Sequence, residues 1–170
     1  MRTMRFLLLG LILLGTIPSH AQLKIGYVDS DAIMNTLPDA QDARQQIDAI
    51  VQEWQSELNK KQSAWKTKYD DYEKRKLIMS EQRRSELESE LITMEQEMVA
   101  YREKKFGTNG ELFQKQDEIM KPVQNKVFTA VQQVAKDEEL DFVLDRSGGV
   151  LVLYAKEEYD ITNKVLEKLK

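Results

Sequence analysis

The sequence predicts a mainly helical α+β protein, in which a long antiparallel helical hairpin projects from a small β body. Three observations support this fold class. No glycine or proline interrupts the chain between Asp39 and Gly107, and apolar residues recur there at coiled-coil spacing. Short apolar runs typical of strands lie near the two ends of the remaining chain. The N-terminus has the layout of an export signal.

The first 21 residues predict a secretory signal. Arg2 and Arg5 precede an apolar run over residues 6–17, and Ser19 and Ala21 place small residues at the −3 and −1 positions of a cleavage site. The alternative is an N-terminal membrane anchor, but the run is shorter than the roughly 20 residues that a spanning helix needs. We therefore expect cleavage after Ala21 and a periplasmic mature protein.

Loss of the signal leaves a chain with a restricted set of reactive side chains. The only histidine, His20, is removed with it, and the sequence has no cysteine. Cysteine nucleophiles, Ser-His-Asp triads and His/Cys zinc sites are thus excluded, and we expect no enzyme activity, metal or cofactor. The mature chain has 23 basic and 29 acidic residues, a net charge of −6. Such a charge disfavours nucleic-acid binding, which depends on basic contacts to phosphates.

The mature chain begins with a predicted strand and a short helix. Ile25 and Tyr27 share one face of a period-two pattern over residues 23–29. Acidic and hydroxyl side chains then cap a helix over residues 32–37. Pro38 suits the first turn of the next helix, because its missing N–H group has no partner there.

Residues 38–122 predict a projecting arm. Alternating steps of three and four residues trace a narrow apolar seam over residues 37–72, and the seam resumes over residues 87–101. Trp54 and Trp65 lie on this seam, so we expect both in the core of the hairpin.

The seam slips at the predicted tip of the hairpin, near residues 78–82, where Ser80 can cap a new helix. The alternative is one continuous helix through this point. Each side of the hairpin would be roughly 60 Å long at 1.5 Å per residue, too long for burial in a compact domain. Gly107 and Gly110 interrupt the returning helix, and since each glycine costs about 1 kcal/mol there, we expect a kink or hinge.

Residues 22–37 and 123–170 predict the body. Residues 141–145 and 150–154 are typical of two strands joined by a glycine-containing turn, and Asp160 can cap a terminal helix. The apolar strand faces are too extensive for so small a body to cover alone. We therefore expect burial between subunits of these side chains: Ile25, Tyr27, Phe142, Leu144, Leu151 and Leu153.

Taken together, these pieces resemble the Skp or OmpH-like family of periplasmic chaperones. The resemblance rests on residues 24–29, on the charged helical hairpin and on residues 123–170, which include the segments 131–135 and 140–145. It implies a homotrimer whose subunits share strands in a central body. It also implies that three hairpins enclose a cavity that holds unfolded outer-membrane proteins without ATP.

The resemblance also suggests surfaces that would contact a client. The candidates are Leu77, Ile78, Met79, Met94 and Met98, because apolar and flexible side chains accept many sequences. The tip residues could equally pack the tip itself, and the seam methionines are more simply hairpin core. A basic cluster at the tip is a charged site or a solvated face; it comprises Lys74, Arg75, Lys76, Arg83 and Arg84.

Two other function classes remain. A structural coiled-coil or scaffold protein of the cell envelope would keep an unbroken seam and lack the strands. An enzyme with paired carboxylates would need a pocket-forming domain, whereas the acids here are spread over helix faces. Known members of the family are strongly basic, so the acidic charge leaves open whether this chain contacts membrane surfaces.

Overall fold

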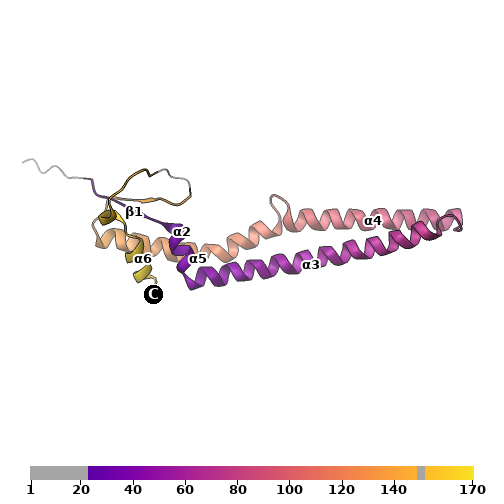
Figure 1. The fold of residues 1–170 in the computed structure, drawn as a ribbon, viewed down its shortest axis with the longest axis horizontal. Helices are drawn as coiled ribbons and strands as arrows, with labels where there is room; N and C mark the ends of the chain where they lie inside the picture. Colours follow the sequence, from indigo (N-terminus) through magenta and orange to yellow (C-terminus); the bar gives the residue numbers. More distant parts are fainter. Residues whose placement is uncertain (1–22, 149–151) are drawn as a thin grey trace, which may run out of the picture.

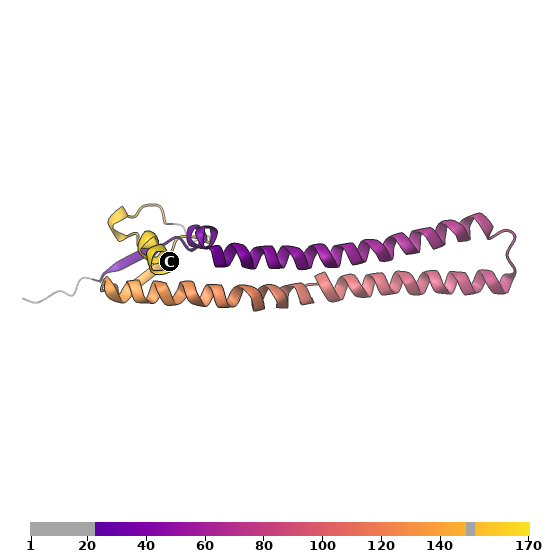
Figure 2. The ribbon, with the colours of Figure 1, turned by 90° about the horizontal axis from the view of Figure 1, so that it is seen from below.

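The computed structural model describes residues 23–148 and 152–170, which form a helical arm extending from a small body (Figures 1 and 2). The predicted signal and its cleavage site after Ala21 lie outside these residues. In chain order the elements are β1 (Ile25–Val28), α2 (Ser30–Thr36), α3 (Pro38–Arg75), α4 (Glu81–Phe106), α5 (Glu111–Asp137), β2 (Phe142–Asp145), the 3-10 helix η1 (Glu157–Tyr159) and α6 (Thr162–Lys168). The predicted fold class, mainly helical with a small sheet, is confirmed.

The arm is an antiparallel pair of helices, as predicted (Figure 2). Helix α3 begins at Pro38. Proline has no backbone N–H group, and in the first turn of a helix this group would have no partner in the helix. At the tip, α3 ends at Arg75 and α4 begins after Ser80, whose hydroxyl accepts a 3.3 Å hydrogen bond from the backbone N–H of Arg83. The continuous helix that was the alternative is thus wrong.

The predicted seam packs the two helices of the arm together. Near the tip, Tyr72, Leu87 and Leu91 are buried, and Trp65 and Met79 pack against them. Trp54, farther from the tip, is half-buried on the same seam, as expected for hairpin core.

The alternating steps over residues 37–72 also pass through Arg44, a charged residue near the body. Arg44 is exposed there, whereas Ala40 and Ala43 are buried in the body core. The reason is a change of partner, since the start of α3 packs against α5 and the rest of α3 packs against α4.

The body core forms where α2, the start of α3, α5 and α6 meet. Ile33 of α2 and Val165 of α6 are fully buried in it. Ile161 and Leu169 are buried as well, so the terminal helix packs one apolar side into the core. Asp160 accepts a 2.8 Å hydrogen bond from the N–H of Thr162, which satisfies a free donor at the start of α6.

The sheet has two parallel strands, with Ile25 beside Phe142 and Tyr27 beside Leu144. Parallel strands need a long connection, and here the whole arm provides it. The expected pairing of residues 141–145 with residues 150–154 in a hairpin is not found. Residues 152–154 form no strand, and residues 149–151 lie outside the described part of the chain. Strand β2 instead uses its hydrogen-bonding edge to pair with β1.

Candidate binding surfaces

The tip of the arm separates the three apolar residues predicted there. Leu77 and Ile78 are 93% and 86% exposed. Met79, in contrast, is half-buried and packs against the cluster formed by Tyr72 and Leu87. The turn between α3 and α4 therefore presents Leu77 and Ile78 to solvent. Met79 covers the end of the hairpin core.

Most members of the basic cluster at the tip are paired with acids of their own helix. Arg75 pairs with Asp71 at 3.4 Å and Arg83 with Glu86 at 3.1 Å, and the remaining pairs are Lys76 with Glu73 and Arg84 with Glu81. The hydrogen bond to Glu73 raises the pKa of Lys76. Exposed pairs of this kind contribute little to stability, because solvent screens the charges. The tip is thus locally neutralised. The sequence contains a feature that indicates this pairing, because an acidic residue lies three or four positions from each of these basic residues.

A surface hollow lies beside the tip. It has a volume of about 940 Å³ and is lined by Arg75, Ile78, Met79, Arg83 and Leu87, among others. It combines apolar side chains with the paired guanidinium groups. Such a surface can contact apolar segments without selecting a sequence.

The two seam methionines lie where the heptad places them. Met94 and Met98 are both half-buried, and Met98 lines a hollow of about 220 Å³ next to Trp65. Beside them, Ile92 and Val99 are 55% and 59% exposed. These two exposed residues were missed because they lie off the seam, where the pattern predicts polar side chains.

Two further apolar side chains are exposed on α5. Phe113 and Phe128 are each 62% exposed. They line two surface grooves that share Arg44 and Met120, with volumes of about 430 and 490 Å³. Neither phenylalanine was predicted as a surface residue, because a helical pattern alone does not show which side of α5 faces solvent.

The outer face of the sheet is largely uncovered within one chain. Ile25, Phe142 and Leu144 are 40%, 57% and 46% exposed, and Leu153 is 86% exposed. Leu151, also predicted for the body interface, lies outside the described residues. The other face of the sheet packs into the core through Val28 and Val143.

Tyr27 differs from its predicted partners on the outer face, because it is buried within its own chain. The guanidinium of Arg146 lies 5.5 Å from its ring centroid, and the C-terminal segment crosses beside it at Asp160. Burial raises the pKa of Tyr27, and the nearby Asp160 carboxylate adds to this. Tyr27 thus serves to hold the C-terminal segment against β1.

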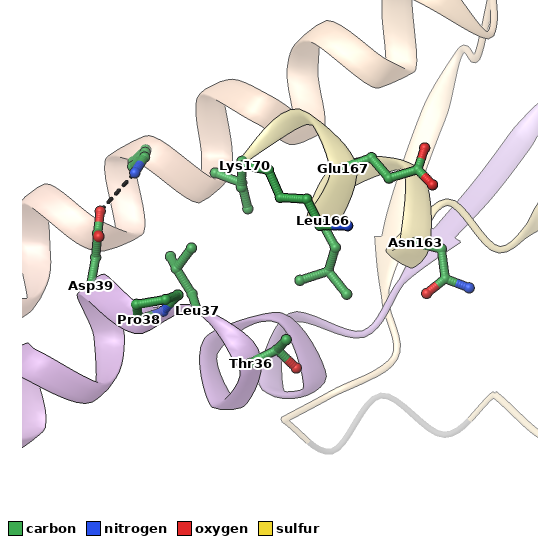
Figure 3. Close-up of a pocket in the computed structure, with 10 residues that line it drawn as sticks. Thr36, Leu37, Pro38, Asp39, Asn163, Leu166, Glu167 and Lys170 are labelled. Atoms are coloured by element: carbon green, nitrogen blue, oxygen red, sulfur yellow. Dashed lines mark hydrogen bonds and ion pairs between the residues drawn. The ribbon is translucent and has the colours of Figure 1, made fainter.

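A hollow of about 770 Å³ lies where the start of α3 meets α6 (Figure 3). Leu37 and Leu166 provide apolar walls. Its rim is charged, and Asp39 accepts a 2.7 Å hydrogen bond from Lys126 there. No site was predicted at this place, because it joins residues that are far apart in the sequence.

The described residues, 23–148 and 152–170, offer no group of three or more His, Cys, Asp or Glu side chains that could hold a metal ion. Over the same residues, no helix has an apolar stretch long enough to cross a membrane. What this part of the chain does present is a set of apolar surfaces spread along the arm and over the body.

The predicted hinge lies at a break between α4 and α5. Gly107 follows the end of α4, and Gly110 precedes the start of α5. Lys105 at the end of α4 forms an ion pair with Glu111 in the first turn of α5. Hydrogen bonding to Lys105 lowers the pKa of Glu111. The two helix ends are therefore joined by side chains as well as by the backbone.

The fold and the sequence are similar to those of known proteins. A search of curated proteins finds no match. Among solved structures, a provisionally assigned outer membrane chaperone (OmpH-like) from Caulobacter crescentus CB15 has the same fold, with a TM-score of 0.73 and 17% sequence identity. The match covers 88% of this chain and 85% of the Caulobacter chain. The profile of the family described as outer membrane protein (OmpH-like) matches residues 24–169. The chain therefore belongs to the OmpH-like family.

Proposed function

We propose that this protein is an ATP-independent holdase of the periplasm, which binds unfolded outer-membrane proteins between helical arms and keeps them from aggregating. It acts as a non-catalytic homotrimer, exported by the signal over residues 1–21. Membership of the OmpH-like family supports a role in outer-membrane protein assembly. The Caulobacter protein of the same fold carries the chaperone name.

The observation that carries the proposal is the distribution of exposed apolar side chains along the arm. Leu77 and Ile78 lie at the tip, Ile92 and Val99 along α4, and Phe113 near the start of α5. An unfolded client exposes apolar segments and strand edges that aggregate. Many weak contacts along an arm suit such a client better than one deep pocket, because they require no particular sequence.

The exposed face of the sheet supports the association of three chains. Its two strands leave Ile25, Phe142 and Leu144 exposed on one face, and large exposed apolar patches mark interaction sites. We infer that three bodies cover these faces mutually and that three arms then surround one client. Binding by several arms at once raises the overall affinity without any tight single contact.

A scaffold role in the envelope is the other candidate, but no feature of residues 23–148 and 152–170 favours it. A spacer gains nothing from exposed Leu77 and Ile78 at a free tip, nor from a break at residues 107–110.

The test is an aggregation assay. An outer-membrane β-barrel protein is diluted from urea into buffer without ATP, and its turbidity is followed with and without the mature protein. Suppression at a molar excess of trimer supports the proposal. Unchanged turbidity, with albumin as the non-specific control, refutes it.

A further inference from the structure

Helices α4 and α5 lie end to end along one side of the arm, and α3 runs beside both without interruption (Figures 1 and 2). Helix α3 thus spans the break at residues 107–110. Any swing of the outer arm about the two glycines must bend α3 or detach α4 from it.

The break itself is a tight turn that leaves no room for a Cβ atom at Gly107 or Gly110. The N–H of Gly110 donates a 2.8 Å hydrogen bond to the carbonyl of Gly107. A Cβ atom at Gly107 would lie 2.4 Å from the carbonyl oxygen of Glu103, and one at Gly110 would lie 2.9 Å from that of Lys105. Both glycines have negative φ angles. They are needed here for space and not for an unusual backbone conformation.

One side chain of α3 contacts the end of α4 at this level. The ring of Trp54 packs edge-on against Phe106, with ring centroids 6.1 Å apart. The ammonium group of the adjacent Lys105 lies 4.3 Å from the centroid of the Trp54 ring. At this distance a cation over the ring face is attracted by its negative charge distribution. Only 18% of the Lys105 side chain is exposed.

Lys105 carries the connection across the break to α5. Its ammonium pairs with Glu111, and Lys104 lies 3.4 Å from the same carboxylate. The cations stand at the C-terminal end of α4 and the anion at the N-terminal end of α5. Each charge is therefore favourable toward its own helix dipole as well as toward its partner.

We propose that Trp54, Lys105, Phe106 and Glu111 form a clamp that holds α4 in line with α5 across the glycine break. Lys105 is its central member, because it contacts α3 through Trp54 and α5 through Glu111. With the clamp closed, the arm moves as one body. With it open, the outer arm gains a second orientation. This device lies beyond the holdase role and does not depend on it.

The test uses spin-label distances, since the chain has no cysteine of its own. Cysteines replace the exposed residues Gln96 on α4 and Gln132 on α5, so that the pair spans the break. Labelled chains are mixed with an excess of unlabelled chains, so that each assembly carries one labelled copy. The wild-type background is expected to give a single narrow distance distribution.

Two substitutions open the clamp. Lys105→Met keeps the aliphatic stem on Trp54 and removes the charge, and Glu111→Gln keeps the shape of its partner. Each is expected to add a second, shifted population to the distances between residues 96 and 132. The matched control is Lys115→Met, which removes a cation paired with Glu118 within α5 alone.

A second label pair, at Ser63 and Gln96, lies within the outer hairpin and reports whether α3 and α4 remain folded together. It is expected to stay unchanged in every variant. A single unchanged distribution between residues 96 and 132 in both K105M and E111Q would overturn the clamp. The clamp would also be overturned if the wild-type distance distribution were as broad as those of K105M and E111Q. The same holds if K115M broadened the distribution as much as they do.

Discussion

The indole N–H of Trp65 on α3 donates a 3.1 Å hydrogen bond to the backbone carbonyl of Leu91 on α4. This contact joins two residues on opposite sides of the hairpin and fixes their relative position along its axis. A coiled-coil seam alone tolerates sliding by whole heptads, because its apolar side chains are similar. A directional hydrogen bond favours one alignment.

Trp65→Phe is therefore expected to destabilise the arm. The loss of the hydrogen bond and part of the ring should lower the free energy of unfolding by about 1–2 kcal/mol. Urea unfolding at fixed protein concentration measures it. Tyr69→Phe is the control, because Tyr69 stacks on Trp65 through its ring, with centroids 5.1 Å apart, and this change leaves the ring in place. If both variants lost the same free energy of unfolding, the hydrogen bond of Trp65 would not explain the loss.

Glu139→Gly is expected to stabilise the protein. Glu139 follows the end of α5 with φ of 54°, a left-handed conformation that costs a non-glycine residue roughly 1–2 kcal/mol. Glycine removes this strain, which we expect to raise Tm by roughly 2–4 °C in a chain of this length. Gln132→Gly, at an exposed position within α5, should lower Tm, because glycine weakens a helix interior by about 1 kcal/mol. A fall in Tm with Glu139→Gly would contradict the prediction.

The seam and the helix ends followed from the sequence because they depend on local rules. Ser80 caps α4 and Pro38 starts α3, as side-chain chemistry predicts. The pairing of the strands did not follow, since a four-residue strand such as β2 has no local preference between partners. Here the arm returns the chain to the body beside β1, and tertiary structure decides the pairing.

The candidate surfaces followed from the sequence only in part. The apolar tip was identified, but the inward turn of Met79 depends on its contact with Leu87 on the other helix. Tyr27 shares its strand face with Ile25, yet only Tyr27 is covered, because Arg146 lies over its ring. The clamp could not be found by pattern, since Trp54 and Glu111 are distant in the sequence and meet through Lys105.

Asp29→Asn is expected to weaken the body in a manner that depends on pH. A hydrogen bond from the N–H of Ala32 lowers the pKa of Asp29, and contact with Arg146 lowers it further. A depressed pKa in the folded state contributes stability above the unfolded value of about 3.9, and this stability is lost as pH falls through the folded pKa.

Urea unfolding of wild type and Asp29→Asn at neutral pH and at stepwise lower pH measures this effect. The difference should be largest at neutral pH and shrink as pH falls below about 4. Asp42→Asn, on the exposed side of α3, is the control for the substitution itself. A gap between wild type and Asp29→Asn that widened toward acid would contradict the assignment.

Substitutions at the tip should weaken client binding and leave the stability of the protein nearly unchanged. Leu77→Ser combined with Ile78→Ser removes two exposed side chains, so the free energy of unfolding should change by no more than about 0.5 kcal/mol. Suppression of client turbidity should nevertheless weaken. The matched control is the exposed adjacent pair Gln45→Ser with Gln46→Ser, near the root of the arm. Equal suppression by the tip variant and wild type would exclude the tip from client binding.

The mass of the complex shows whether three arms hold one client. The mature protein is mixed with an outer-membrane β-barrel protein diluted from urea, and the complex is measured by size-exclusion chromatography with multi-angle light scattering. The expected mass equals three copies of this chain and one client. A single-copy mass for the protein, or its elution without any client, would contradict it.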